Sequence, residues 1–459
     1  MADNSPITSR LNRTRRFSGL VAGQSARIAG GRALDKVRSD DAKERAQAKR
    51  TAEVVEQIVV QLGSMKGAAM KLGQVLSTIE MPGLDAESSE RIQRRMAALR
   101  DDAPSVPFAK LEKLMKAEWG EPVGKVLRDI EPEAMAAASI GQVHRAVTTD
   151  GREVAVKVQY PGIAEAVEAD LRNLGMVMPL LKRLAPGIDT KALAAELRER
   201  ITEELDYELE ATSQRRVARL WRGHPHVAVP SVDLEHSTRR VLVTDLLEGL
   251  RFDDLKARPD ADRDRVGEVV HRFFYWTASA HDLVLGDPHP GNWQLLPDGR
   301  VVMFDFGMAR SVSRGYVRRE GPAVEAIRSQ DRDALFAGMC DLGYLGEGGW
   351  VDRDLLLAHM TIASQWLLED QPVRLSPEFQ RAMGEELFAL GSQWRDMVRR
   401  FSLPQEAVLY RRMADLLFVG CCQLRAAADW WALAEELQIG GEPRTALGLE
   451  HAAWAAGRS

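Results

Sequence analysis

The chain has little cysteine and no long apolar run. Three of its 459 residues are cysteines, at positions 340, 421 and 422. The adjacent pair Cys421-Cys422 fits neither a zinc spacing nor a disulfide framework, so we expect two small buried side chains in a reducing compartment. No apolar run approaches the roughly 20 residues of a transmembrane helix, and the N-terminus lacks the apolar region of a secretory signal. We therefore predict a cytoplasmic protein, and peripheral contact with a membrane stays open.

Strong net charge is also absent. The 62 Lys and Arg residues are nearly balanced by 67 Asp and Glu residues, which gives a formal net charge of -5. This balance gives no reason to expect a nucleic-acid partner. A hydrophobic content of 45% with 28% charged residues is ordinary for a soluble globular protein, and the length predicts two or three subdomains.

The segment 281–307 combines two acidic residues and an asparagine at a fixed spacing. Asp287 precedes Asn292 by five residues, and a turn and a short apolar strand then lead to a DFG sequence that begins at Asp305. Transfer of a phosphoryl group from ATP needs one carboxylate that orients or deprotonates the acceptor, and an Asn and a second Asp that hold divalent metal. The protein-kinase pattern has the same five-residue step and the same DFG. The segment therefore predicts a phosphoryl-transfer site.

A lysine upstream fits the same chemistry. The run 154–159, VAVKVQ, places Lys157 on a predicted strand, from which a kinase lysine reaches the phosphates of ATP. The alternative is an edge residue that limits aggregation.

A helix predicted over 191–221 has an acidic run. Such a run is often only a solvated face, but a kinase fold needs one glutamate on this helix to pair with the strand lysine. The segment 246–249, which includes Glu248, would be the hinge between two lobes.

Glycines are missing where a kinase would have its phosphate loop. The chain has Ala136-Ala137-Ala138-Ser139 there, and only Gly141 follows. Glycine lets a backbone approach phosphates closely, which alanine does less freely. We therefore expect the nucleotide to be held differently and ordinary protein-kinase activity to be disfavoured.

The first 105 residues contain two segments of different character. Residues 1–45 are rich in Arg, Ser, Gly and Ala; a basic arm on an anionic membrane or partner is one interpretation, and a flexible solvated leader is the favoured one. Residues 46–105 have a helical pattern, which Pro82-Gly83 splits. Lys71 and Gln74 lie three apart and so project from one helical face. On composition alone they are a solvated pair.

Several other segments of the sequence predict helices or strands but contain no candidate site residues. We expect helices at 106–119 and 262–280, and a β-hairpin of Val227–Val229 with Val241–Leu247. The region after Gly307 is predicted to be helical. Its tryptophans are expected to anchor the core: Trp350, Trp366, Trp394, Trp430, Trp431 and Trp454.

Together these motifs resemble the UbiB family of atypical kinases, also called the ADCK or aarF-domain family, whose members are associated with ubiquinone and other isoprenoid-lipid metabolism. The resemblance covers residues 19–310. It depends on five segments in order: Lys71-Leu72-Gly73-Gln74 (the KxGQ signature), Ala136–His144, Val154–Gln159, Glu204–Glu210 and Asp287–Asn292. It implies an α+β, bilobal protein-kinase-like fold, with a small β-containing N-lobe, a helical C-lobe and an N-terminal helical extension that carries KxGQ.

The resemblance also implies catalytic roles. Lys157 would pair with Glu210 and contact the phosphates of ATP. Asp287 would occupy the catalytic-base position, and Asn292 and Asp305 would bind Mg²⁺.

A regulatory contact is implied as well. Glu204 and Asp206 match the family's ExD motif, which would meet Lys71. The helix with Lys71 and Gln74 would then cross the active site, where a protein substrate would otherwise dock. Many members have Ala where this chain has Gly141, and we expect the glycine to loosen the loop.

These expectations give four segments: a basic arm (1–45), a helical extension (46–105), an N-lobe (106–248) and a helical C-lobe (249–459). The leading hypothesis is an ATP- and Mg²⁺-dependent atypical kinase or slow ATPase with a small or lipid-linked acceptor, such as an isoprenoid-quinone precursor. The alternatives are a nucleotide-gated scaffold or chaperone without phosphoryl transfer, and a small-molecule kinase of the aminoglycoside or choline type.

Overall fold

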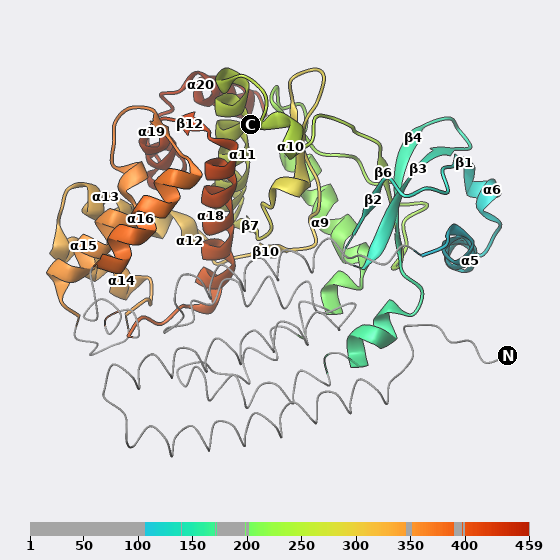
Figure 1. Ribbon diagram of the computed structural model, residues 1–459, viewed down its shortest axis with the longest axis horizontal. Helices are drawn as coiled ribbons and strands as arrows, with labels where there is room; N and C mark the ends of the chain where they lie inside the picture. Colours follow the sequence, from blue (N-terminus) through green and yellow to red (C-terminus); the bar gives the residue numbers. More distant parts are fainter. Residues whose placement is uncertain are drawn as a thin grey trace, which may run out of the picture. The chain divides into compact units, whose positions relative to one another are not determined.

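The computed structural model describes residues 106–138, 140–169, 171, 198, 202–345, 351–389, 397 and 400–458 (Figure 1). The chain divides into two compact units. One comprises Met1–Leu209 and Asp233–Asp245, and the other comprises Glu210–Val232 and Leu246–Ser459. The predictions for Lys71, Gln74 and Ser139 lie outside the described residues.

The first unit is built on an antiparallel sheet. Its strands are β1 (Leu127–Ile130), β2 (Ala136–Ala137), β3 (Gly141–Thr148), β4 (Glu153–Gln159) and β6 (Val241–Asp245), in the order β1-β3-β4-β6 with β2 against β3. Alternation along β4 buries Val154, Val156 and Val158, as expected for a strand with one face on a core. Helix α5 (Phe108–Trp119) contributes to that core, and the short α6 (Val123–Val126) follows it. The helix predicted at 106–119 is confirmed.

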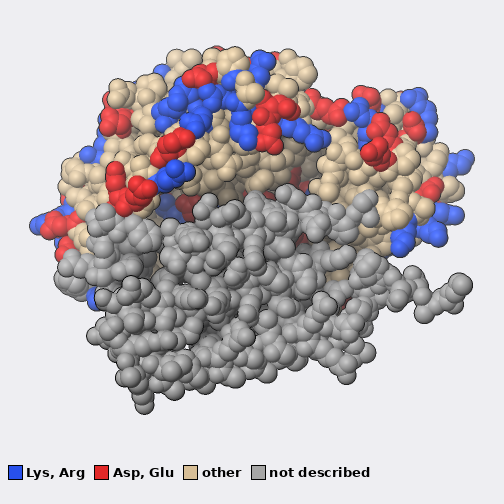
Figure 2. Space-filling view, in the orientation of Figure 1, with Lys and Arg blue, Asp and Glu red and all other residues tan. Residues whose placement is uncertain are grey.

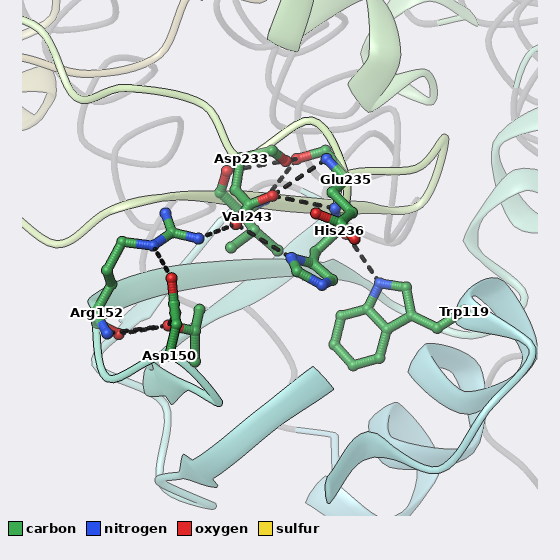
Figure 3. A network of polar contacts seen from close by, with 9 residues as sticks. Trp119, Asp150, Arg152, Asp233, Glu235, His236 and Val243 are labelled. Carbon is green, nitrogen blue, oxygen red and sulfur yellow. Dashed lines mark hydrogen bonds and ion pairs between the residues drawn. The ribbon is translucent and has the colours of Figure 1, made fainter. Parts of the chain in front are cut away.

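A polar network fastens the segment before β6 to the β3–β4 turn and to α5 (Figure 3). Arg152 donates hydrogen bonds to Asp150 at 2.9 Å and to Asp233 at 2.7 Å. Burial raises the pKa of Asp233, but hydrogen bonds from Arg152 and His236 outweigh it and hold the pKa below its ordinary value. The Trp119 indole N–H donates to the His236 carbonyl at 2.8 Å. The start of β6 is thus fixed to two other elements.

The described part of the second unit is mostly helical. Its helices are α9 (Tyr207–Leu220, which begins in the first unit), α10 (Phe252–Leu255), α11 (Asp260–His281), α12 (Tyr316–Arg319), α13 (Gly321–Arg328), α14 (Arg332–Asp341), α15 (Arg353–Ala363), α16 (Pro377–Ala389), α18 (Gln405–Leu424), α19 (Trp430–Ala434) and α20 (Ala446–Ala456). Its small sheets are β5 (Val227–Ala228) with β9 (Val301–Met303) and β8 (Trp293–Leu295), β7 (Leu283–Leu285) with β10 (Ala309–Ser311), and β11 (Val373–Arg374) with β12 (Ala427–Ala428). The helix predicted at 262–280 is confirmed as α11.

Helices α11 and α18 form the centre of the large core. Phe273 on α11 and Met413 on α18 are both fully buried. Cys421 and Cys422 are buried, as predicted, and burial raises the pKa of the Cys422 thiol to about 12. Cys340 is exposed. None of the helices in the described residues is long and apolar enough to cross a membrane.

The tryptophan prediction is confirmed for the four tryptophans of this region that lie in the described residues. Trp430 and Trp431 are buried, and Trp366 and Trp454 are partly buried and pack against the large core. The other two, at positions 350 and 394, lie outside the described residues.

Helix α20 is attached to the carboxyl end of α9. Arg458, just beyond α20, donates to the carbonyls of Arg222 at 2.9 Å and Arg219 at 2.7 Å, and the last carbonyls of a helix lack partners within it. Trp221 stacks on Trp454 with a centroid distance of 5.7 Å. These contacts hold the end of α9 within the helical unit.

The predicted β-hairpin is wrong. Strand β5 pairs in parallel with β9, with Val227 opposite Val301, whereas β6 pairs with β4. Short apolar runs indicate strands but do not specify which strand lies beside them.

The helix predicted over 191–221 is interrupted. The chain turns at Leu205 and Asp206, and α9 starts at Tyr207. The Asp206 carboxylate accepts a hydrogen bond from the backbone N–H of Glu208 at 3.0 Å, which is the geometry of a helix N-cap. An aspartate that looked like part of an acidic helix face therefore begins a new helix.

On the face shown in Figure 2, the acidic and basic side chains of the described residues are interspersed. This mixture agrees with the balanced composition of the chain.

Candidate catalytic site

The loop between β7 and β8 brings the predicted catalytic residues of the second unit together. The side-chain amide of Asn292 donates to the backbone carbonyl of Asp287 at 3.2 Å. The backbone carbonyl of Asn292 accepts from the N–H of Phe304 at 2.7 Å, one residue before Asp305. His289 closes the turn, because its Nδ1 accepts from the N–H of Gly291 at 3.0 Å. Hydrogen bonds therefore fix the loop and the start of the DFG to each other.

Asp305 has an unusual backbone conformation. Its φ is +60°, in the left-handed region that residues with a Cβ adopt only at a cost. The side chain of Asp305 is exposed and accepts from the Gly307 N–H at 3.1 Å, while the neighbouring Phe306 is buried. Strained backbone of this kind concentrates at functional sites.

The oxygens at this position suit Mg²⁺. The Asn292 amide nitrogen donates to Asp287, so its Oδ1 is the atom suited to bind a cation, and the Asp305 carboxylate is the second oxygen ligand that the sequence predicts. Mg²⁺ prefers oxygen ligands and is commonly held by one or two carboxylates together with substrate phosphates and water. Within the described residues, no group of three or more His, Cys, Asp or Glu side chains could hold a metal ion.

Lys157 lies in the middle of the first unit's sheet. Strand β4 has β3 on one side and β6 on the other, with Lys157 between Val143 and Leu242. The alternative of an edge residue is therefore wrong. The Lys157 ammonium lies 4.9 Å from the centroid of the Tyr207 ring, a cation–π distance.

The alanine-rich loop forms a hairpin. Ala136 and Ala137 in β2 are exposed and pair with Val143 and Gln142, and the N–H of Ala138 donates to the carbonyl of Gly141 at 2.8 Å. At Gly141 a Cβ would collide with the Val158 carbonyl on β4, and the expectation that this glycine loosens the loop stays a prediction. Its missing side chain permits close strand pairing.

The remaining predicted residues have the following places. Glu210 is buried on α9 with 7% of its surface exposed. Glu204 is half-buried, and Asp206 caps α9 and lies 3.5 Å from the guanidinium of Arg239. Glu248 is exposed, in a segment that is held to β8 because the Gly249 N–H donates to Gln294 Oε1 at 2.9 Å. The pairing of Lys157 with Glu210 stays a prediction.

Sequence reasoning missed Arg412. This residue lies on α18, with its Nη2 3.7 Å from Asp287 Oδ1 and its Nε donating to the Gly286 carbonyl at 3.1 Å. The side chains of Arg412 and Asp287 are only 7% and 11% exposed. The available signal was weak: two adjacent arginines, 411 and 412, within an otherwise largely apolar helix.

The chain is similar to a known domain family and to named proteins. The ABC1 atypical kinase-like domain model matches residues 98–337, just over half of the chain. The chain is 29% identical over 388 residues to atypical kinase coq-8, mitochondrial, from Caenorhabditis elegans, covering 83% of this chain and 50% of that protein. It is 28% identical over 375 residues to atypical kinase COQ8B, mitochondrial, from Rattus norvegicus, covering 81% and 69%. The match thus spans half of the first relative's length.

A solved structure is also similar. The complex of Rv3197 with erythromycin, from Mycobacterium tuberculosis, is 31% identical with a TM-score of 0.66, and the match covers 87% of this chain and 99% of that one. The α+β, protein-kinase-like fold class is confirmed. The chain belongs to the ABC1 family of atypical kinase-like proteins, the UbiB family that its motifs resemble.

Proposed function

We propose that the protein is an ATP- and Mg²⁺-dependent atypical kinase or ATPase. Its turnover would be slow or lipid-stimulated, and its acceptor would be water or a small or lipid-linked molecule in isoprenoid-quinone metabolism. The observation that supports this most is the hydrogen-bonded loop in which Asn292 links Asp287 to the residue before Asp305. Phosphoryl transfer depends mainly on positioning and electrostatics, and these contacts support a shared role for Asp287, Asn292 and Asp305.

Each residue of the second unit would have one task. Asp287 would accept the proton of the acceptor hydroxyl or of water, or orient that hydroxyl. Asn292 Oδ1 and the Asp305 carboxylate would hold Mg²⁺, which when bound neutralises charge on the transferred phosphate. Glu248 lies in the segment 246–249, which would contact the base of the nucleotide.

The first unit would hold the phosphates. Lys157 would contact them and pair with Glu210, and the alanine hairpin with Ser139 would lie over them. The exposed β2 alanines have a small side chain in place of the glycine hydrogens of a kinase loop, which supports a different grip on the nucleotide. Protein substrates would be disfavoured for this reason.

Access to the site would be regulated by the N-terminal extension. Lys71 and Gln74 would meet Glu204 and Asp206, since a lysine that enters a partly closed pocket needs a carboxylate. Peripheral membrane contact by a cytoplasmic protein would bring lipid-linked acceptors within reach. The curated relatives described above are named as mitochondrial proteins.

The test is ADP release by the purified chain with Mg²⁺ and ATP, with and without anionic liposomes. We expect slow release that rises with liposomes and is lost in EDTA. Asp305→Asn, purified in the same way, measures contaminating ATPase. Release that is equal in wild type and Asp305→Asn would contradict the proposal.

A nucleotide-gated binding protein is the second candidate. The observation that favours it is the similar structure solved with erythromycin, which is a bulky amphipathic macrolide. A scaffold binds its partners without converting them, so a binding role would be enough to explain affinity for bulky amphipathic molecules. Tight binding of Mg²⁺-ATP without ADP release, with or without liposomes, would put this candidate first.

A further inference from the structure

Helix α18 packs along the catalytic loop. A Cβ at Gly286, immediately before Asp287, would collide with the Leu409 side chain of α18. Further along α18, a Cβ at Gly420 would lie 3.5 Å from the Pro290 ring. Gly286 therefore lets the Leu409 side chain lie directly against the loop, whereas a Cβ at Gly420 would make only an ordinary van der Waals contact with the ring. The loop is supported by a helix more than a hundred residues away in sequence.

Arg412 is the charged residue of α18 at this contact. Its guanidinium donates through Nε to the Gly286 carbonyl at 3.1 Å, and its Nη2 lies 3.7 Å from Asp287 Oδ1. With 7% of its side chain exposed, Arg412 remains charged because the guanidinium does not lose its proton in proteins. A charge this deeply buried is costly unless it is paired, and the carboxylate of Asp287 is the acidic partner at this end.

The loop itself has no such cation. The protein-kinase pattern places an arginine directly before the catalytic Asp, whereas this chain has Gly286 there. Residues 283–293, LVLGDPHPGNW, contain neither lysine nor arginine. Arg412 therefore places a permanent positive charge, from another element, beside a loop that lacks one.

We propose that Arg412 is a positioning residue for Asp287, an inference that depends on the proposed function. It fixes the loop through the Gly286 carbonyl and attracts Oδ1 of the carboxylate. A separation of 3.7 Å is an ion pair rather than a hydrogen bond, so the lone pairs of Asp287 stay available to the acceptor. Arg412 itself would touch neither nucleotide nor acceptor.

The experiment measures turnover and nucleotide affinity separately. For Arg412→Met we expect kcat for ADP release to fall about 30-fold, because small displacements of a catalytic group cost up to about 100-fold in rate. The Kd for Mg²⁺-ATP should stay within about threefold, since the residues that bind metal are untouched. Arg412→Lys keeps the charge without the planar guanidinium and should recover part of kcat.

The control is the neighbouring arginine. Arg411 forms an ion pair with Glu320 instead. Arg411→Met should therefore lower stability, and it should not lower kcat selectively. In a chain that already contains Asp287→Asn, adding Arg412→Met should lower the single-turnover rate by less than about a further threefold, because the two residues act as a unit.

Three outcomes would overturn the inference: an unchanged kcat, a parallel loss of kcat and ATP affinity, or additive effects in the double variant. If Arg412→Met does not fold, Arg412→Lys takes its place in the test. Its kcat should then fall by a larger factor than its affinity for Mg²⁺-ATP. Absence of ADP release by wild type would instead refute the proposed function together with this inference.

Discussion

Asp287→Asn should reduce ADP release by at least about 100-fold, because general acid–base catalysis by a positioned side chain contributes about 10²- to 10⁴-fold. The amide has nearly the shape of the carboxylate but cannot accept the acceptor's proton. Asp287 binds the loop through its backbone carbonyl, which receives the Asn292 amide at 3.2 Å, and this bond survives the substitution. We therefore expect the Kd for Mg²⁺-ATP to remain within about threefold of wild type.

The matched control for this prediction is Asp298→Asn. Asp298 is an exposed aspartate in the turn between β8 and β9, paired with Arg300. Its loss should leave turnover nearly unchanged. The account is contradicted if Asp287→Asn retains more than about a tenth of wild-type turnover, or if it loses turnover and ATP affinity together.

Glu320→Ala should lower the free energy of unfolding of the helical unit by about 3 kcal/mol, since removal of one partner from a buried ion pair costs about 3–5 kcal/mol. Glu320 is 3% exposed, pairs with Arg411 and accepts from the Tyr344 hydroxyl at 2.9 Å. Burial raises the pKa of Tyr344, so the phenol keeps its proton and donates. The lower end of the range is expected because Arg411 is 38% exposed and stays partly solvated.

Urea unfolding followed by tryptophan fluorescence measures this loss. Arg332→Ala is the comparison, because Arg332 pairs with Asp354 on the surface and exposed pairs are worth about 0–1 kcal/mol. Equal shifts of the urea midpoint in the two variants would show that the Glu320 network contributes no more than a surface pair.

Local patterns were sufficient to predict the residues of the candidate site that lie close together in sequence. Asp287, Asn292 and Asp305 fall within one 19-residue segment, and their spacing alone indicated the chemistry. The strand that contains Lys157 was equally visible from its alternation, although only the sheet order shows that it is central.

Features that depend on distant partners were not predicted. Arg412 contacts Gly286 across 126 positions in sequence, and no local pattern encodes such a distance. The partner of β5 was missed for the same reason, because its pairing with β9 is set by tertiary structure. The close approach of Gly141 to the Val158 carbonyl was not predicted either, because it exists only in the folded sheet.

We propose above that Asp305 holds the metal of an Mg²⁺-ATP site. The most direct test is equilibrium binding of ATP while Mg²⁺ is titrated, for wild type and Asp305→Asn. We predict that Mg²⁺ increases wild-type affinity at least about tenfold, because the ion neutralises charge between the phosphates and the carboxylate, and that the variant shows little increase. An identical Mg²⁺ dependence in the two proteins would contradict the account.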